Sequence, residues 1–336
     1  MKKVRVGING FGRIGRIATR IALARPGIEI VAINSRADST SHAYLLKYDT
    51  TYGIFPHVIE TKPNQIVVDK KPIQVFQVAD PSQIPWKKAE VDIVVEATGA
   101  FRRLSDAQKH LSSGAKRVVV SAPPKDAIPT FCMGVNHHRY DPKTDRVISN
   151  ASCTTNCLAT VAKVLHDSFT ITKGFMTTTH AYTDSQNLLD NSHKKSLRLG
   201  RSAANNIIPS DTGASHALGI VIPDLSGKII SSAIRVPVIT GSLIDLTVEV
   251  KKKPSVETVN QAFEQAEKGL LRGILALSYD PLVSSDIRGS SLSALVDEKL
   301  TQVFDQMINV KAWYDNEWGY STRLIDLVEY VASKGI

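Results

Sequence analysis

The thiol of Cys153 is the first candidate for chemistry in this sequence. Residues 146–149 predict a strand and residues 156–166 a helix, so Cys153 stands where the chain passes from strand to helix. In the first turn of a helix the dipole lowers the pKa of a thiol and favours the nucleophilic thiolate. Cys157, one turn further along, is better placed for burial, and Cys132 lies in an apolar run that indicates a structural role.

A nucleophilic thiol needs a base, and His180 is the candidate that we consider. It lies near the end of a predicted strand, residues 173–182, whereas most of the nine histidines lie in polar loops. Spacing alone does not select it, because a histidine at the edge of a core with satisfied hydrogen bonds fits the same pattern. The residues alone do not favour either interpretation of His180, as a base or as a structural histidine. The three cysteines contain no Cys-x-x-Cys pair, so we expect neither a disulfide framework nor a metal site.

A glycine-rich loop near the start predicts a dinucleotide site. Gly10, Gly12 and Gly15 follow a predicted strand, residues 4–9, and open a predicted helix, residues 13–25. In this context the first glycine permits a tight turn, the second lets a pyrophosphate approach the backbone, and the third lets the helix lie close to the strand. The amides of Arg13 and Ile14 would face the anion at the positive end of the helix. The alternative is a tight turn without a ligand.

The second strand, residues 29–34, should end on an acidic residue if the adenosine ribose is unphosphorylated. The sequence instead has Asn34, Ser35 and Arg36. A hydroxyl and a guanidinium suit a 2′-phosphate, so NADP is favoured over NAD. In the alternative, Arg36 is solvated and Asn34 or Asp38 holds the ribose diol, which gives NAD or dual use.

The order of elements predicts an α/β fold with two domains. Near-continuous Val and Ile runs separated by helices indicate a doubly wound parallel sheet, a Rossmann domain, in the first half. Alternating segments in the second half, such as residues 243–252, indicate an α+β domain with a mostly antiparallel sheet. We place the nucleotide-binding domain at residues 1–152 and the catalytic domain at residues 153–316. The helix within residues 317–336 is expected to return to the first domain. The remaining expected elements are strands at 91–97, 116–121, 228–236 and 310–314, and helices at 104–111, 255–268 and 320–332.

Composition restricts the class of protein. The chain has 336 residues, 43% hydrophobic and 22% charged, which is ordinary for a globular protein. No apolar run approaches the ~20 residues that span a bilayer. The basic start at residues 1–3 is soon interrupted by glycine and polar residues, so we expect no secretory signal and a cytoplasmic protein. A net charge of +9 fits a nucleic-acid-binding protein, but the basic residues are dispersed, which favours an enzyme for small polyanions.

A resemblance then decides between these alternatives. Ser152-Cys153-Thr154-Thr155-Asn156-Cys157 resembles the active-site signature of glyceraldehyde-3-phosphate dehydrogenases. The similarity extends along the whole chain through residues 8–16, 47–50, 96–99, 179–183, 206–209, 235–237 and 313–320. By this resemblance Cys153 is the nucleophile, His180 is its ion-pair partner and general acid–base, and Asn316 orients the nicotinamide carboxamide. Further cofactor contacts implied in this way are Thr98, Gly99, Ser121 and Ser192.

The resemblance implies a phosphorylating oxidation of glyceraldehyde 3-phosphate to 1,3-bisphosphoglycerate with NAD(P), through a hemithioacetal and a thioester on Cys153. It assigns Thr183 and Arg235 to the substrate phosphate. Inorganic phosphate is assigned to Ser152, Thr154, Thr212 and Gly213. The implied assembly is a homotetramer, working in glycolysis or gluconeogenesis.

Three departures from the usual family pattern are visible. Ser35 and Asn191-Ser192 replace the Asp and the hydrophobic-Pro pair of NAD-using members, which again favours NADP. Leu199 stands where an arginine is usual, and Val238-Ile239-Thr240-Gly241 replaces the common Thr-Pro-Asn-Val. These two changes affect a phosphate-site loop and the region after Arg235.

Two other functions are alternatives to this interpretation as a glyceraldehyde-3-phosphate dehydrogenase. One is an erythrose-4-phosphate dehydrogenase, which shares the fold and the thiol but passes its thioester to water. The other, of a different class, is a nucleic-acid-binding or regulatory protein that has kept the dinucleotide fold.

Overall fold

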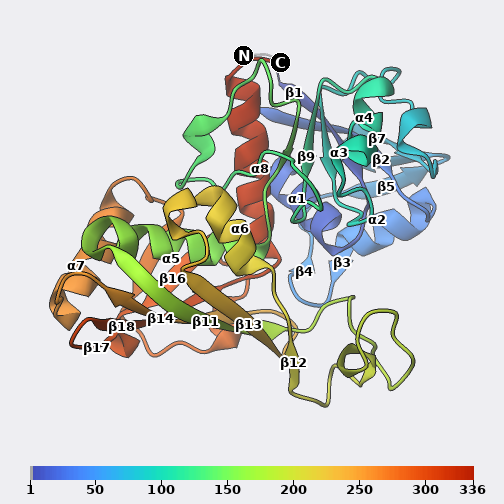
Figure 1. Ribbon diagram of the computed structural model, residues 1–336. Coiled ribbons are helices and arrows are strands. Elements are labelled where there is room, and N and C mark those ends of the chain that lie inside the picture. The colour runs from blue at the N-terminus through green and yellow to red at the C-terminus, as the bar shows by residue number, and fades with distance from the viewer. Residues whose placement is uncertain (1–2) are drawn as a thin grey trace. The chain divides into compact units, whose positions relative to one another are not determined.

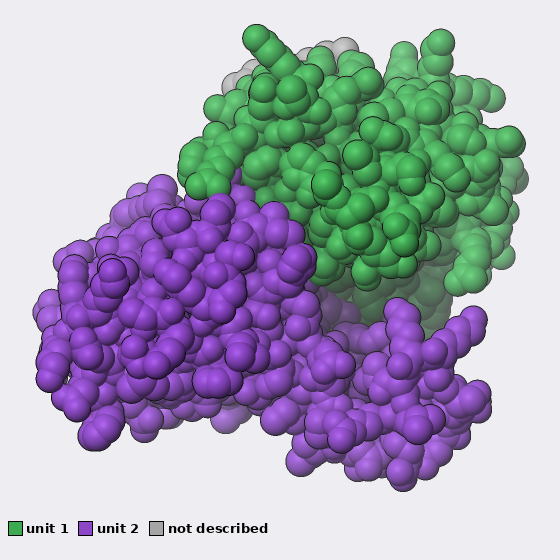
Figure 2. Space-filling model, viewed as in Figure 1, with its two compact units in different colours: residues 1–132, 137–151, 321–336 green, residues 133–136, 152–320 purple. Residues whose placement is uncertain are grey.

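The structure is a computed structural model that describes residues 3–336. Residues 1 and 2, where the basic start of the sequence lies, are outside the described residues. The chain forms two compact units, shown in different colours in Figure 2. Unit 1 comprises residues 1–132, 137–151 and 321–336, and unit 2 comprises residues 133–136 and 152–320. The domain boundaries placed from the sequence stay a prediction.

Unit 1 is built on an eight-stranded sheet with the order β10-β9-β8-β1-β2-β7-β6-β5 (Figure 1). The pairings from β10 to β7 are parallel, and β7, β6 and β5 continue antiparallel. The strands are β1 (Val4–Asn9), β2 (Ile28–Asn34), β5 (Ile59–Lys62), β6 (Gln65–Val68), β7 (Lys71–Phe76), β8 (Ile93–Glu96), β9 (Arg117–Val120) and β10 (Val147–Ser149). The predicted doubly wound class is confirmed.

The strand order predicts a ligand site at the ends of β1, β2 and β8. β1 pairs with β2 on one side and with β8 on the other, so the chain winds in opposite directions from β1. In open α/β sheets such a switch point, at the carboxyl ends of the strands, is where ligands bind. The glycine loop that follows β1 therefore lies at the position where a nucleotide is expected.

The helices of unit 1 are α1 (Arg13–Leu23), α2 (Ser39–Lys47), α3 (Leu104–Ala107), α4 (Lys109–Ser112) and α8 (Trp318–Ser333). α1 packs on β2, and α4 packs on β9. The helix expected over residues 104–111 is divided into two single-turn helices at Gln108, for which we have no physical account. The turn after α1 is joined to α8 by an ion pair between Arg25 and Asp326 at 2.8 Å. A short hairpin joins β3 (Tyr48–Asp49) and β4 (Gly53–Ile54).

Unit 2 contains a sheet with the order β12-β13-β11-β14-β18-β16-β15, and β17 pairs with β18. Five of its seven pairings are antiparallel, as predicted, while β11–β13 and β15–β16 are parallel. The strands are β11 (Ile171–Ala181), β12 (Ile208–Ser210), β13 (Ile229–Val236), β14 (Ser242–Val250), β15 (Leu275–Ser278), β16 (Ala294–Asp297), β17 (Gln302–Phe304) and β18 (Met307–Tyr314). The helices are α5 (Cys153–Phe169), α6 (Ala214–Val221) and α7 (Val256–Lys268).

One face of this sheet forms the core of unit 2. Ile244, Leu246 and Val248 of β14 are fully buried, and α5 packs on β14, β16 and β18. The alternating strand residues face the other way, as the period of two in β14 predicts. On that other face Phe175 and its parallel partner Ile230 are 66% and 63% exposed, so two large apolar side chains lie side by side there.

Within residues 3–336, no helix combines the length and the hydrophobicity needed to cross a membrane.

Candidate active site

The glycine loop after β1 has the backbone shape that a pyrophosphate requires. Gly10 has φ +93°, and a Cβ there would lie 2.7 Å from the carbonyl carbon of Ala97 and from the nitrogen of Thr98. A Cβ at Gly15 would lie 2.1 Å from the carbonyl oxygen of Gly10, so only glycine lets α1 start this close to the loop. At Gly12, by contrast, a Cβ would meet nothing within 4 Å, so this position opens onto unfilled space.

The N-terminus of α1 fits an anion. Gly12 is its N-cap and supplies no side chain to the first-turn amides, where Arg13 and Ile14 lie. The guanidinium of Arg13 forms an ion pair with Asp49, so this side chain is directed toward the loop after α2. The backbone of the turn, rather than the Arg13 side chain, is therefore the part suited to a phosphate.

Behind this loop lies a buried polar network centred on Glu96, at the end of β8. One carboxylate oxygen accepts hydrogen bonds from the backbone nitrogen of Thr98, at 2.8 Å, and from its hydroxyl. The other accepts from Asn9 Nδ2 at 2.5 Å and faces His110 Nε2 at 3.0 Å. Trp86 Nε1 donates to His110 Nδ1 at 3.0 Å, which places the proton of a neutral ring on Nε2. The network thus fixes the backbone of Thr98 beside Gly10.

The end of β2 carries the residues expected near the adenosine ribose. The side-chain amide of Asn34 is held by three hydrogen bonds: Nδ2 donates to Asn9 Oδ1 at 2.7 Å and to the Val78 oxygen, while Oδ1 accepts from the Val78 nitrogen. Asp38 accepts from the backbone nitrogen of Ser41 as the N-cap of α2. Ser35 is half-buried and Arg36 exposed, and no salt bridge of Arg36 is found among residues 3–336. Ser35 and Arg36 are therefore the side chains here that are most available to a ligand.

Three other predicted cofactor residues follow the ends of neighbouring strands. Thr98 and Gly99, which has φ +70°, come directly after β8. Ser121 comes directly after β9, and its nitrogen donates to the carbonyl oxygen of Glu96 at 2.9 Å. These positions share the carboxyl edge of the sheet with the glycine loop, because β1, β8 and β9 are parallel.

In unit 2 the candidate nucleophile and base lie within contact distance. Cys153 is the first residue of α5, and its N-cap Ser152 accepts a hydrogen bond from the Thr155 nitrogen at 3.1 Å. Cys153 Sγ is 3.5 Å from Nε2 of His180, the penultimate residue of β11. The other ring nitrogen of His180 lies 2.7 Å from the Ala181 oxygen, which holds the plane of the ring.

Arg235 completes this group from the neighbouring strand. Arg235 of β13 is the partner of His180 in the parallel pairing of β11 and β13. Arg235 Nη1 lies 2.7 Å from His180 Nδ1 and 3.0 Å from the Ala181 oxygen. The Ala181 oxygen can only accept, so Nδ1 carries the proton of the neutral ring and Nε2 is free to accept one. The positive charge of Arg235 so close to the ring disfavours a second proton there. The arginine is therefore placed both to hold an anion and to influence the base.

The ionisation of the pair differs from the simple helix-dipole expectation. Burial of the sulfur raises the pKa of the Cys153 thiol, against the lowering predicted from its place in the first turn, although the positive charge of Arg235 works in the other direction. Burial and then Arg235 lower the pKa of His180 to about 3, with the Ala181 hydrogen bond opposing. Without ligands both side chains are therefore favoured in their neutral forms, and a neutral imidazole is the form that can accept the thiol proton.

Tyr314 and Thr178 lie next to this pair and were not among the predicted site residues. The Tyr314 hydroxyl lies 2.9 Å from Thr154 Oγ1 and 2.8 Å from Thr178 Oγ1, and its ring stands edge-on to His180. Tyr314 is buried, and burial raises its pKa well above the ordinary value, so it is a neutral phenol. The strand signal at residues 310–314 located this tyrosine but gave no reason to place it beside the thiol.

The other predicted phosphate residues are not in hydrogen-bond contact with Cys153 or His180 among residues 3–336. Thr183 Oγ1 lies 2.8 Å from Ser185 Oγ, in the loop after β11. The Thr212 hydroxyl accepts from the Ala214 nitrogen at 3.3 Å, and Gly213 is the N-cap of α6, where a Cβ would meet nothing within 4 Å. Ser192, predicted to contact the cofactor, is exposed in the loop between β11 and β12.

The departures noted in the sequence have defined places. Thr240 is buried and donates to Asp315 Oδ1 at 2.8 Å, next to Asn316. Gly241 has φ +88°, and a Cβ there would lie 2.1 Å from the Ser284 oxygen, so this turn requires glycine. Leu199 is half-buried, and its carbonyl oxygen accepts from the Asn187 nitrogen within the loop between β11 and β12. The segment after Arg235 is therefore part of the support for Asn316.

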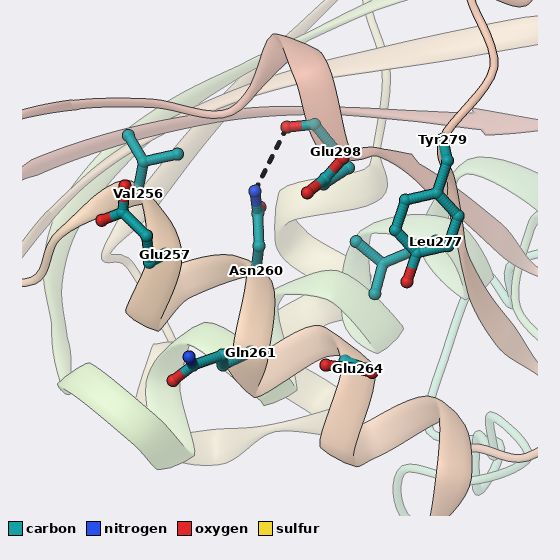
Figure 3. A pocket seen from close by; sticks show the side chains of 8 residues that line it. All are labelled: Val256, Glu257, Asn260, Gln261, Glu264, Leu277, Tyr279 and Glu298. Atoms are coloured by element: carbon teal, nitrogen blue, oxygen red, sulfur yellow. Dashed lines mark hydrogen bonds between the residues drawn. The ribbon is translucent and has the colours of Figure 1, made fainter.

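A separate pocket of about 420 Å³ lies in unit 2 beside α7 (Figure 3). Its lining residues are Val256, Glu257, Asn260, Gln261, Glu264, Leu277, Tyr279 and Glu298. None of them is a predicted site residue, and none is a cysteine, histidine or basic residue suited to a phosphorylated aldehyde. The candidate reactive side chains lie at the thiol, not in this pocket.

The chain is similar to known proteins along almost its whole length. Residues 152–316 match the family model described as glyceraldehyde 3-phosphate dehydrogenase, C-terminal domain, and residues 4–104 match its NAD binding domain. The chain is 51% identical over 334 residues to a glyceraldehyde-3-phosphate dehydrogenase of Geobacillus stearothermophilus, with 99% of each chain covered. It is 49% identical over 333 residues to glyceraldehyde-3-phosphate dehydrogenase 1 of Bacillus cereus, again with 99% of each chain covered. A third relative, glyceraldehyde-3-phosphate dehydrogenase 2 of a Nostoc strain, is 50% identical, with 99% of this chain and 100% of the relative covered.

Proposed function

The chain belongs to the glyceraldehyde-3-phosphate dehydrogenase family. We propose that it oxidises glyceraldehyde 3-phosphate to a thioester on Cys153 and then transfers the acyl group to inorganic phosphate. It is an oxidoreductase that uses a nicotinamide dinucleotide, and the family implies glyceraldehyde 3-phosphate and inorganic phosphate as substrates. The observation that carries the proposed chemistry is the 3.5 Å approach of Cys153 Sγ to His180 Nε2. Nothing in the comparisons favours an erythrose-4-phosphate dehydrogenase or a nucleic-acid-binding protein.

The first step joins the sulfur to the aldehyde carbon. Cys153 attacks, the C=O π electrons move to oxygen, and the neutral His180 takes the thiol proton and delivers it to that oxygen, which gives a hemithioacetal. His180 then takes the hydroxyl proton as the carbon is oxidised to a thioester. A bound nicotinamide dinucleotide supplies the acceptor for the hydride that leaves this carbon.

The second half of the reaction releases the acyl group. An oxygen of inorganic phosphate attacks the thioester carbon, the C–S bond breaks, and Cys153 is restored while 1,3-bisphosphoglycerate leaves. We assign Arg235 and Thr183 to the substrate phosphate, and Ser152, Thr154, Thr212 and Gly213 to inorganic phosphate. The positive charge of Arg235, 2.7 Å from the base, and the open N-cap at Gly213 support this assignment.

The requirement for inorganic phosphate tests the proposed reaction. Formation of reduced cofactor from glyceraldehyde 3-phosphate, followed at 340 nm, should continue beyond one equivalent per active site only when phosphate is present. An erythrose-4-phosphate dehydrogenase passes its thioester to water, so sustained turnover in phosphate-free buffer, with a preference for the four-carbon aldehyde, would overturn the proposal.

We propose NADP as the favoured cofactor, with NAD as a possible second one. Both hydrogens of the Asn34 amide are already used and its oxygen already accepts one hydrogen bond, so this side chain is held in place and is less available to a ribose diol. Asp38 already accepts from the start of α2, while Ser35 and Arg36 offer a hydroxyl and a cation. Gly10, Gly12, Gly15, Arg13 and Ile14 would hold the pyrophosphate, and Asn316 the carboxamide.

Replacing Arg36 with alanine tests this preference. We expect Arg36→Ala to raise KM for NADP by about 10-fold or more, because an Arg–phosphate pair contributes about 1.5–3 kcal/mol. KM for NAD should change by less than about twofold. Initial rates with both cofactors, with the exposed Arg103→Ala as a control, measure the difference. Equal changes for the two cofactors would assign Arg36 to solvent.

We also propose a homotetramer in the cytoplasm. The exposed side chains of Phe175 and Ile230 on the sheet of unit 2, and of Tyr44 and Ile54 in unit 1, support burial against other copies. Light scattering coupled to size-exclusion chromatography would measure the assembly, and a monomeric mass at micromolar concentration would contradict it.

A further inference from the structure

Ser242 joins the base to the proposed cofactor contact, although neither composition nor spacing marks it. It is the first residue of β14, the strand that lies between β11 and β18, and it is fully buried. β11 carries His180 near its end, and Asn316 follows β18 by two residues. Ser242 therefore lies on the strand between β11 and β18, within hydrogen-bond reach of the residues at the ends of both.

The hydrogen bonds of Ser242 have a fixed direction. The backbone nitrogen of Ala181, the residue after His180, donates to Ser242 Oγ at 3.1 Å, so the oxygen is an acceptor there. The single hydroxyl hydrogen then goes to Asn316 Oδ1 at 2.8 Å. One hydroxyl thus connects the end of the strand that carries the base with the side-chain amide of Asn316.

This bond determines which end of the Asn316 amide is available. Its oxygen accepts from Ser242, and Thr240 Oγ1 lies 3.4 Å from the same oxygen while donating more closely to Asp315. No hydrogen bond from Asn316 Nδ2 is found among residues 3–336. Turning the amide over would leave the Ser242 hydrogen facing a donor, which is costly in a buried site. The NH₂ group is therefore the end presented to a ligand, and it matches a carbonyl oxygen.

We propose that Ser242 is a positioning residue for the redox step. It orients Asn316 so that the amide hydrogens meet the carbonyl oxygen of the cofactor carboxamide, and it holds Asn316 next to the end of β11, the strand that carries His180. The inference rests on the proposed function, because it needs a nicotinamide ring to orient. Ser242 touches neither substrate nor cofactor and acts through Asn316.

A double-mutant cycle distinguishes this role from a merely structural one. We expect Ser242→Ala to lower kcat by about 10- to 100-fold, the usual effect of losing alignment at a reacting centre, with KM for glyceraldehyde 3-phosphate little changed. In the Asn316→Ala background the same change should lower kcat by less than about twofold, because the group that Ser242 orients is gone. Equal losses in the two backgrounds would overturn the proposal.

Two further measurements keep the result decisive. Ser293 is a buried serine of unit 2 whose hydroxyl has no hydrogen-bond partner among residues 3–336, so Ser293→Ala should leave kcat unchanged and controls for loss of a buried hydroxyl. Thermal unfolding verifies that each variant is folded. If Ser242→Ala does not fold, Ser242→Cys replaces it in the double-mutant cycle, and the same changes in kcat are expected. A wild-type enzyme that fails to oxidise glyceraldehyde 3-phosphate would refute the proposed function, whereas an active wild type with an additive cycle would refute this inference alone.

Discussion

Replacing Cys153 with serine is expected to abolish oxidation of glyceraldehyde 3-phosphate, with kcat falling by at least about 10⁴-fold. A serine hydroxyl is a far weaker acid than a thiol, and an oxygen ester would not transfer its acyl group to phosphate as a thioester does. Binding of NADPH should be retained, because the glycine loop lies in unit 1 and Cys153 in unit 2. Steady-state rates and a fluorescence titration with NADPH measure the two effects separately.

The matched control is Cys157→Ser, the same chemical change four residues along α5. Cys157 is buried and its sulfur faces the Ala312 carbonyl oxygen at 3.9 Å, so it takes no part in the proposed chemistry. This variant should keep most of its activity. Mass spectrometry of enzyme quenched during turnover without phosphate should find the acyl adduct on Cys153. An adduct on another side chain, or near-normal turnover by Cys153→Ser, would remove the thioester mechanism.

The second large effect is expected for His180→Asn, with a decrease in kcat of about 10²- to 10⁴-fold. The neutral imidazole accepts the protons of the thiol and of the hemithioacetal, and asparagine cannot. The residual rate should rise with pH. Burial raises the pKa of Cys153, so below that pKa each added pH unit increases the thiolate fraction about tenfold. A pH–rate profile of the variant against wild type measures both the loss and the slope.

His138→Asn provides the control, since His138 is an exposed histidine of unit 1 outside the proposed site. Its profile should coincide with that of wild type. If His180→Asn retained wild-type kcat, or if its rate did not change with pH, another group would have to be the base.

Much of the fold could be predicted from local pattern. The Val and Ile runs of β1, β2, β8 and β9 and the glycine spacing before α1 are signals contained within short segments. The hairpin strands β5 and β6 were not foreseen, because β5 is mostly exposed and its polar residues give no core-facing alternation. α5 was predicted to begin at residue 156 but begins at Cys153, where the Ser152 cap sets its start.

The site was predictable in its residue types and not in its electrostatics. Cys153 lies at a strand–helix junction that the sequence reveals, and the family resemblance selected His180 among nine histidines. The pKa directions of this pair depend on burial and on Arg235, which is 55 positions from His180 and becomes its neighbour only through the pairing of β11 with β13. Tyr314 and Ser242 contribute in the same way, through strand pairings between distant segments.

The indole of Trp86 has a consequence for spectroscopy. It is fully buried, and its only polar atom bonds to the histidine that supports Glu96, which in turn holds the backbone beside the glycine loop. Indole emission is sensitive to the loss of a hydrogen bond and to entry of water. With Trp313 and Trp318 replaced by phenylalanine, Trp86 would be the only tryptophan left. Its emission maximum would then shift when the glycine loop becomes more mobile, although the indole contacts no ligand itself.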